Sequence, residues 1–377
     1  MANMLDYLDW RGDLPFSTTP MGEADALILS CLSYINYQGI VSEDDSAEVT
    51  LEQASERFFA LHSLKELASD ISFIRNMPSL LKKAASTLRY KDIRLSCYQD
   101  VTDTEKDVQF AAVRLILPDG SIFLSFRGTD DTIVGWKEDF RLSVGRVEAQ
   151  ILAVSYTEHV LLDTVSTGSP CPKIYLGGHS KGGNLAEYAA AYCRDDIQKA
   201  ITQIYDMDGP GFSRKALQTS RFEAIKDRVK FYVPGFSIIG MLMHHHRMPV
   251  VVRSSERTIM AHDAMTWQIL GPDFVKLEAI SETAAFFDAS LNEWVDSLEA
   301  DKRINFINDF FGVLEASGCK TLTELKELDL HHVTAVLQRL ETVEPRTRKT
   351  VSALLRILMD NFTAGLSEEI RARLHKS

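Results

Sequence analysis

The chain has 377 residues, 45% of them hydrophobic and 25% charged, which suits a soluble globular protein with a sizeable core. Its formal net charge of -12 argues against a nucleic-acid partner, which would require clustered lysines and arginines. Residues 1–16 lack a signal-peptide core, and no apolar run approaches the roughly 18 residues of a membrane-spanning helix. The cysteines, odd in number and without paired motifs, are expected to be reduced thiols. We therefore expect a cytoplasmic protein without integral membrane contact.

The first quarter of the chain has a helical pattern. Apolar residues recur at helical spacing over 23–37, 51–67 and 77–88. This segment, residues 1–90, carries no chemistry of its own. We expect it to pack as helices on the core.

The pattern changes to a period of two near residue 92, where a core predicted over residues 91–275 begins. Strands are predicted at 92–100, 109–117, 121–126, 173–176, 201–207, 229–233 and 249–254, with a helix at about 147–165. The second and third strands form a hairpin through a Pro-Asp-Gly turn. Strands that alternate with helices predict a mostly parallel sheet in an α/β architecture. The pattern is helical again from about Asp273, and residues 276–377 are predicted to form a C-terminal helical region.

A G-x-S-x-G pattern centred on Ser180 lies between a predicted strand and a predicted helix. This context indicates a nucleophile elbow, in which the serine occupies a sharp, strained turn. Gly178 and Gly182 permit that turn because they lack the Cβ atoms that would collide.

A serine hydroxyl needs a base to take its proton, and α/β-hydrolases order the residues as serine, acid, histidine. His262 follows the last predicted core strand and is the favoured base. His179 is adjacent to the serine and is expected to point away from it. The run His244-His245-His246 is expected to be a solvated loop, because neighbours on an extended chain alternate sides and do not form a metal site by themselves. No metal or organic cofactor is implied.

Asp208 is the favoured acid, because it ends the strand after the elbow strand and should emerge at the same edge of a parallel sheet. Asp206, within that strand, is the second choice, and Asp263 beside the histidine is the third. A purely structural role for Asp208 as a turn anchor stays open.

An ester hydrolase also needs donors for the oxyanion. The backbone N–H of Lys181 and the turn at Thr129 are the candidates. Ile238, Met241 and Leu242 belong to an apolar segment that either lines an acyl pocket or is a buried helix start. The cation of Lys181 beside the nucleophile would favour an anionic ester such as a lysophospholipid.

Three motifs in this order resemble those of the class 3 (fungal-type triacylglycerol) lipases: Arg127-Gly128-Thr129, the elbow around Ser180, and the late His262. The variant Gly-His-Ser-Lys-Gly-Gly-Asn-Leu-Ala at 178–186, with Asp-Gly-Pro-Gly-Phe and His-Asp-x-x-x-Trp downstream, resembles a bacterial family of lipase-like α/β-hydrolases. The resemblance implies an α/β-hydrolase fold with these residues in the roles given above. It also implies that Arg127 is a buried cation paired with Asp139.

The acid departs from the lipase pattern. Class 3 lipases place it in the loop after the strand predicted at 229–233, where this chain has Pro-Gly-Phe-Ser-Ile at 234–238. Either Asp208 supplies the acid, or the site is a dyad, or activity has been lost.

The sequence therefore predicts a serine hydrolase of the lipase or esterase type that cleaves carboxylic esters through an acyl-enzyme on Ser180. The expected partner is a small-molecule or lipid ester. Transient contact with a membrane surface and the oligomeric state stay open. The alternatives are a non-catalytic binding protein with the same fold and a serine peptidase or acyltransferase.

Overall fold

The structure is a computed structural model that describes residues 2–63, 67, 74–103, 108–129, 133–142, 145–166, 171–282, 284–285, 300–321, 324, 330–345, 347–352 and 355. The chain divides into two compact units. The first comprises Met1–Asp70, Ile74–Gly128 and Arg146–Ala289, and the second comprises Ile71–Phe73, Thr129–Gly145 and Ser290–Ser377. The division predicted from the sequence, with boundaries at 90 and 275, stays a prediction.

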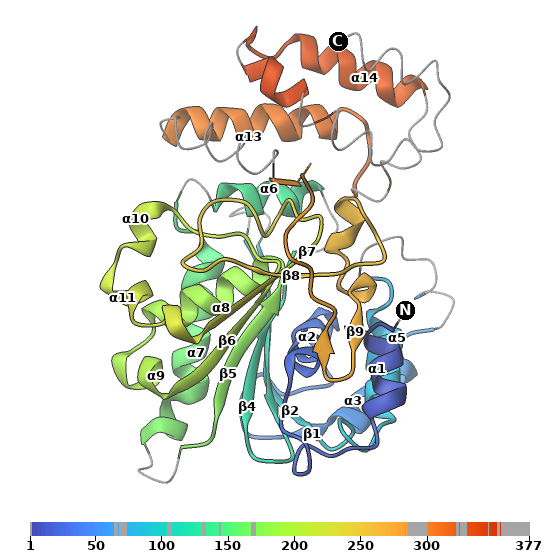
Figure 1. Ribbon diagram of the computed structural model, residues 1–377, viewed down its shortest axis with the longest axis vertical. Helices are drawn as coiled ribbons and strands as arrows, with labels where there is room; N and C mark the ends of the chain where they lie inside the picture. The colour runs from blue at the N-terminus through green and yellow to red at the C-terminus, as the bar shows by residue number, and fades with distance from the viewer. Residues whose placement is uncertain are drawn as a thin grey trace. The chain divides into compact units, whose positions relative to one another are not determined.

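The first unit is built on an eight-stranded sheet whose strands lie in sequence order (Figure 1). Strands β1 to β4 pair antiparallel, and β4 to β8 pair in parallel. The strands are β1 Val49–Thr50, β2 Arg94–Asp103, β3 Val108–Ile116, β4 Ile122–Phe126, β5 Ile174–His179, β6 Ile201–Met207, β7 Val229–Pro234 and β8 Val250–Val252. The mostly parallel sheet predicted from the sequence is confirmed.

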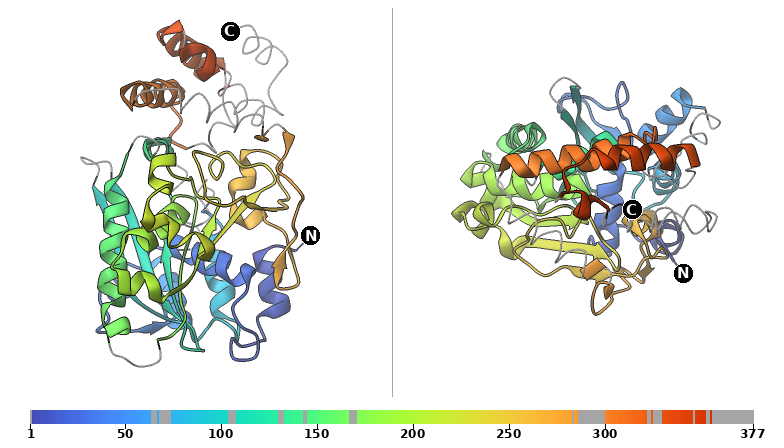
Figure 2. Two further views of the ribbon diagram at one scale, coloured as in Figure 1. Left: turned by 60° about the vertical axis from the view of Figure 1, so that its left-hand side comes forward. Right: turned by 90° about the horizontal axis from the view of Figure 1, so that it is seen from above.

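Helices cover both faces of this sheet (Figures 1 and 2). One layer contains α1 Met4–Arg11, α2 Glu23–Cys31, α3 Leu51–Leu61 and α5 Met77–Ala85. The other contains α7 Glu148–Ser166, α8 Lys181–Tyr192, α9 Asp195–Ala200, α10 Arg214–Leu217 and α11 Ser220–Glu223. Because the parallel strands follow one another in order, right-handed crossovers put the connecting helices on one face and leave the other to the N-terminal helices.

Strand β4 illustrates how the sequence serves both layers. Leu124 and Phe126 are buried against the side that carries α7 and α8, whereas Phe123 is buried among the N-terminal helices. Ser125 also faces the N-terminal layer, where its hydroxyl donates to the carbonyl of Leu29 at 2.8 Å. The strand is buried on both faces, so apolar side chains lie on both of its sides.

The N-terminal layer is held together by a buried ion pair. Arg89 and Asp25 are 0% and 1% exposed and form a bidentate contact at 2.7 and 2.8 Å. The hydroxyls of Tyr7 and Tyr90 donate to the same carboxylate, and the guanidinium lies 3.9 Å from the centre of the Phe16 ring. This network joins α1 and α2 to the end of α5.

The helical pattern predicted from Asp273 begins too early. Asp273–Phe274 forms β10, which pairs antiparallel with β9, Ile269–Leu270. Gly271 makes the connecting turn with φ +63°, a conformation that L-residues with a side chain rarely adopt. The turn glycine decides the local structure here, whereas the apolar residues around it do not distinguish strand from helix.

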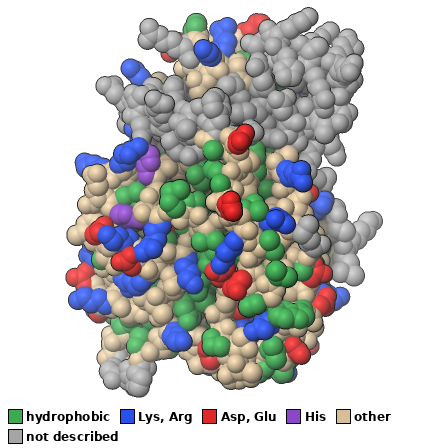
Figure 3. Space-filling view, in the orientation of Figure 1, with side chains coloured by type: hydrophobic (Ala, Val, Ile, Leu, Met, Phe, Trp, Pro, Cys, Tyr) green, Lys and Arg blue, Asp and Glu red, His purple; other side chains and the backbone are tan. Residues whose placement is uncertain are grey.

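The second unit contains α6 Ile133–Arg141, α13 Ala300–Glu315 and α14 Leu330–Glu341. Phe140 of α6 packs against Phe310 and Phe311 of α13, with ring centres 5.9 and 5.2 Å apart. Ile307, Phe311 and Leu314 of α13 are buried, whereas much of the helical region predicted over 276–377 lies outside the described residues. None of the helices in the described ranges is long and apolar enough to span a membrane. The face in Figure 3 carries acidic and basic side chains interspersed with apolar ones.

Candidate active site

Ser180 lies at the junction of β5 and α8 with φ 57° and ψ -135°. This is a strained backbone for a residue with a side chain. The turn is tight because three glycines allow close approach. A Cβ at Gly178 would collide with Gly182, one at Gly182 with the carbonyl of Phe126, and one at Gly183 with the Asp206 carboxylate. The geometry is that of a nucleophile elbow.

Asp208 follows β6 and contacts His262 directly. Its Oδ2 lies 2.7 Å from His262 Nδ1, and the two residues are 0% and 6% exposed. A carboxylate oxygen only accepts, so Nδ1 carries the proton and the lone pair of the neutral ring is on Nε2. Asp208 itself has φ 60°, and its N–H donates to the carbonyl of Tyr232 in β7. The acid and the histidine predicted from the sequence are therefore brought together.

Ser237 holds the other oxygen of the acid, which the sequence did not suggest. Its hydroxyl donates to Asp208 Oδ1 at 2.5 Å and accepts the N–H of Gly240 at 3.1 Å. Ser237 belongs to the loop after β7, where class 3 lipases carry their carboxylate. A residue of this loop thus contacts the carboxylate of Asp208, which follows the neighbouring strand β6.

His262 is the last residue of a short 3-10 helix, Ile259–His262, which is held in place by a hydrogen bond from Trp267. The indole of Trp267 is fully buried and donates to the carbonyl of Ala261 at 2.9 Å. Asp263 caps the next turn through the N–H of Met265 at 2.9 Å, and burial raises the pKa of Asp263 to about 6. Its carboxylate serves this cap, which leaves Asp208 as the acid bonded to His262.

The side chain of His179 points away from Ser180, as predicted, and it forms hydrogen bonds with His262 and Tyr34. Its Nε2 lies 2.8 Å from the carbonyl oxygen of His262, so Nε2 donates, and Nδ1 accepts from the hydroxyl of Tyr34 at 2.9 Å. The rings of His179 and His262 lie 4.7 Å apart. Burial, together with the neighbouring His262, holds the pKa of His179 well below its usual value. The neutral ring links the elbow to the loop that carries His262.

Asp206, the second candidate acid, is fully buried. Its Oδ1 accepts the N–H of Gly209 at 2.7 Å, which anchors the loop that presents Asp208. Its other oxygen faces Glu187 of α8. Asp206 therefore supports the acid's loop.

Lys181 does not present a cation to a substrate. Its side chain is fully buried, and Nζ donates to the carbonyl of Gln109 in β3 at 3.0 Å. The expectation of a preference for anionic esters loses its basis here, because the first residue of a helix need not project toward the preceding serine. Lys181 is the first residue of α8, and the helix dipole favours negative charge at this end.

Gly128 brings the loop after β4 against the elbow, since a Cβ there would collide with Tyr34 and the carbonyl of His179 and touch Ser180. Thr129 follows it and begins the second unit, so its role as an oxyanion donor stays a prediction. Arg127 pairs bidentately with Asp100, both contacts at 2.8 Å. The side chain of its expected partner, Asp139, lies outside the described residues.

The predicted substrate residues lie in the loop after β7. Ile238 and Leu242 are 5% and 6% exposed, whereas Met241 is partly buried. The carbonyl of Leu242 accepts the N–H of Gly211, so this loop packs on the one that follows Asp208. Contact with a substrate stays a prediction.

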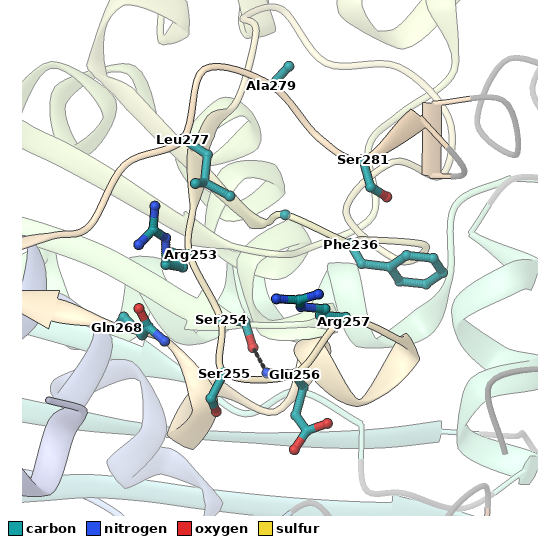
Figure 4. A pocket seen from close by; sticks show the side chains of 11 residues that line it. Phe236, Arg253, Ser254, Ser255, Glu256, Arg257, Gln268, Leu277, Ala279 and Ser281 are labelled. Carbon is teal, nitrogen blue, oxygen red and sulfur yellow. Dashed lines mark hydrogen bonds between the residues drawn. The ribbon is translucent and has the colours of Figure 1, made fainter. Parts of the chain in front are cut away.

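A pocket of about 640 Å³ lies beside β8 and is lined in part by Gly235 and Phe236, which precede Ser237 (Figure 4). Figure 4 shows Arg253 and Arg257 in its wall, together with Phe236. The lining contains neither Ser180 nor His262 and none of the predicted substrate residues. The cavity is thus adjacent to the acid's support rather than to the nucleophile.

The three consecutive histidines do not form a solvated loop. His244 pairs with Phe212 in an antiparallel bridge, and both ring nitrogens of His245 are buried. The ring of His245 stacks on Phe231 of β7 with centres 3.8 Å apart. Side chains of an extended chain point alternately to its two sides, which argued against a site made of all three histidines. The same alternation points the ring of His245 toward the interior.

The sheet order, the elbow at Ser180 and the Asp208–His262 contact define an α/β-hydrolase-like fold. The chain belongs to the Mbeg1-like family, whose sequence model matches residues 84–312, more than half of the chain. No curated protein matches the sequence. A crystal structure of M37 lipase has a TM-score of 0.37 and 14% identity, over 59% of this chain and 70% of that one. Nothing about activity follows from a similarity this weak.

Proposed function

We propose that this protein is a serine hydrolase of the lipase or esterase type that cleaves carboxylic esters. The observation that carries the proposal is the 2.7 Å contact between buried Asp208 and His262 Nδ1, next to a serine with the strained backbone of an elbow. An acid, an imidazole that bonds it through Nδ1 and a serine on a sharp turn are the parts that acyl transfer needs.

In this proposal Ser180 Oγ attacks the ester carbonyl while His262 Nε2 takes its proton. The negative oxygen that forms is stabilised by the N–H of Lys181 and by Thr129. His262 then gives the proton to the leaving alcohol, and water releases the acyl group by the same steps in reverse. Asp208 stabilises the imidazolium, and Ser237 and His179 hold the acid and the base in place.

Labelling by a fluorophosphonate probe, read by intact mass, tests the proposal. Wild type should gain one adduct, and Ser180→Ala should gain none. Ser166→Ala, an exposed serine at the end of α7, is the matched control and should label like wild type. An unlabelled wild type would favour a non-catalytic binding protein. The main argument for that alternative is the missing carboxylate after β7, and the contact between Ser237 and Asp208 weakens it.

The substrate class needs a second assay. A series of p-nitrophenyl esters of increasing acyl length, run beside peptide amides, separates an esterase from a peptidase. Since Lys181 is buried on Gln109, we expect no preference for anionic over neutral esters. Faster cleavage of amides than of esters would favour the peptidase alternative, and transfer of the acyl group to an added alcohol would favour an acyltransferase.

A further inference from the structure

A second cluster of chemically active groups lies beneath the elbow and has no part in the hydrolase mechanism. Glu187 projects from α8, Asp206 from β6 and His245 from the segment after β7. One ligand atom from each of these residues lies within 4.8 Å of the other two. Three elements that are distant in sequence thus converge on one point.

The carboxyl groups of Glu187 and Asp206 are buried, and each of the three residues has a buried polar atom without a hydrogen-bond partner in the part of the chain that the structure describes. Glu187 is 4% exposed and Asp206 is 0% exposed. Glu187 Oε1, Asp206 Oδ2 and both ring nitrogens of His245 have no hydrogen-bond partner. The backbone of Gly240 lies close to the His245 ring, but the contact falls short of hydrogen-bond geometry. A buried polar atom without a hydrogen-bond partner destabilises the fold, and a charged one does so more strongly, so the cluster calls for an occupant.

The chemistry of the three groups narrows the choice of occupant. Two carboxyl groups and one imidazole ring meet in the cluster. Glu187 and Asp206 lie close enough to share a proton, but that proton would leave both ring nitrogens of His245 without a partner. A cation would accept a lone pair from all three residues.

We propose that Glu187, Asp206 and His245 bind one divalent transition-metal ion of the Zn²⁺ type. Two carboxylate oxygens and an imidazole nitrogen suit such an ion, whereas Mg²⁺ and Ca²⁺ prefer oxygen ligands throughout. Ligand bonds of about 2.0–2.2 Å put tetrahedral ligand atoms about 3.3–3.6 Å apart, so the three ligand atoms, which lie within 4.8 Å of one another, would draw together on binding. That ring is fixed by its stacking on Phe231.

The ion has a structural role in this proposal. It ties α8, the helix that begins at the nucleophile, to the strand and loop that present Asp208. Asp206 completes the link, because its second carboxylate oxygen accepts the N–H of Gly209. The ion lies behind the elbow and takes no part in the transfer of the acyl group.

The test measures metal content and melting temperature on tag-free full-length protein. After chelation and dialysis, the protein is titrated with Zn²⁺, and with Mg²⁺ in parallel. Wild type should bind one equivalent of Zn²⁺ and melt at a higher temperature with it, and Mg²⁺ should have no effect. Glu187→Gln and Asp206→Asn should each weaken Zn²⁺ binding at least about 100-fold, since a residue that bonds the ion directly is lost. His159→Ala, an exposed histidine on α7, should bind like wild type.

Two results would overturn the proposal. One is a wild type that neither binds Zn²⁺ nor changes its melting temperature, while Glu187→Gln melts higher, which is the result expected of a shared proton. The other is Zn²⁺ binding that persists in Glu187→Gln and Asp206→Asn. Because the readouts are binding and melting, they are independent of whether Ser180 is a nucleophile.

Discussion

The substitution Asp208→Asn tests the proposed acid most sharply. Ser237 donates to Oδ1, so the asparagine oxygen should stay there, and the amide NH₂ would then face His262 Nδ1. Two donors would meet unless the imidazole proton moved to Nε2, where the ring could no longer accept the serine proton. An Asp→Asn change in a Ser-His-Asp triad lowers kcat about 10⁴-fold. We expect that loss here, equivalent to about 5 kcal/mol of transition-state stabilisation.

The assay is the kcat for p-nitrophenyl butyrate, with the rate of fluorophosphonate labelling as a second readout. Circular dichroism melting checks that the variant is folded. Asp263→Asn makes the same chemical change in the residue after His262, and it should keep activity within about tenfold because Asp263 caps the turn at Met265. The reasoning is refuted if Asp208→Asn stays within tenfold of wild type or if Asp263→Asn is equally impaired.

Three further predictions concern stability, each read by urea unfolding. Gly182→Ala should destabilise by about 3 kcal/mol, because the new Cβ collides with the backbone carbonyl of Phe126. Arg89→Met should cost about 3–5 kcal/mol, because it leaves Asp25 as an unpaired buried charge. The pKa of His179 is lowered in the fold, so below its usual value near 6.5 the unfolded chain takes up a proton that the folded protein does not. The free energy of unfolding should therefore fall as pH drops from 7 to 5, and in His179→Gln the slope should be smaller by up to about 1.4 kcal/mol per pH unit.

Each of these has a matched comparison. Gly145→Ala should be close to neutral, since a Cβ there meets nothing within 4 Å. Adding Asp25→Leu to Arg89→Met should restore at least half of the lost stability, and an unchanged loss would mean that packing rather than charge is responsible. An identical pH slope in wild type and His179→Gln would contradict the argument for a neutral histidine.

The architecture was predictable because it follows from periodicity and turn signals. The runs at 173–176, 201–207 and 229–233 are rich in β-branched and aromatic residues and are each closely followed by glycine or proline, and they correspond to β5, β6 and β7. The rule that parallel strands end at a common edge selected Asp208, and the structure places its carboxylate on His262. Its catalytic role stays a prediction.

The details of the site were not predictable, since they depend on side-chain direction and loop packing. Lys181 follows the nucleophile in sequence but points to Gln109, because α8 turns it away from the preceding serine. Ser237 lies in a loop without a periodic pattern, so the sequence does not indicate its hydrogen bond to Asp208. That contact depends only on the conformation of the loop. His245 was dismissed because its neighbours point elsewhere, yet the alternation of the chain is what buries its ring nitrogens.

The contact between Tyr34 and His179 has a consequence for anyone who trims this protein. The family match begins at residue 84, which invites a shorter fragment that starts there. Such a fragment would lack the hydroxyl of Tyr34, which donates to His179 beside the elbow. It would also expose the apolar face of the sheet that α2 covers. We expect it to aggregate on expression, so the practical minimum of this hydrolase-like domain includes its first helices.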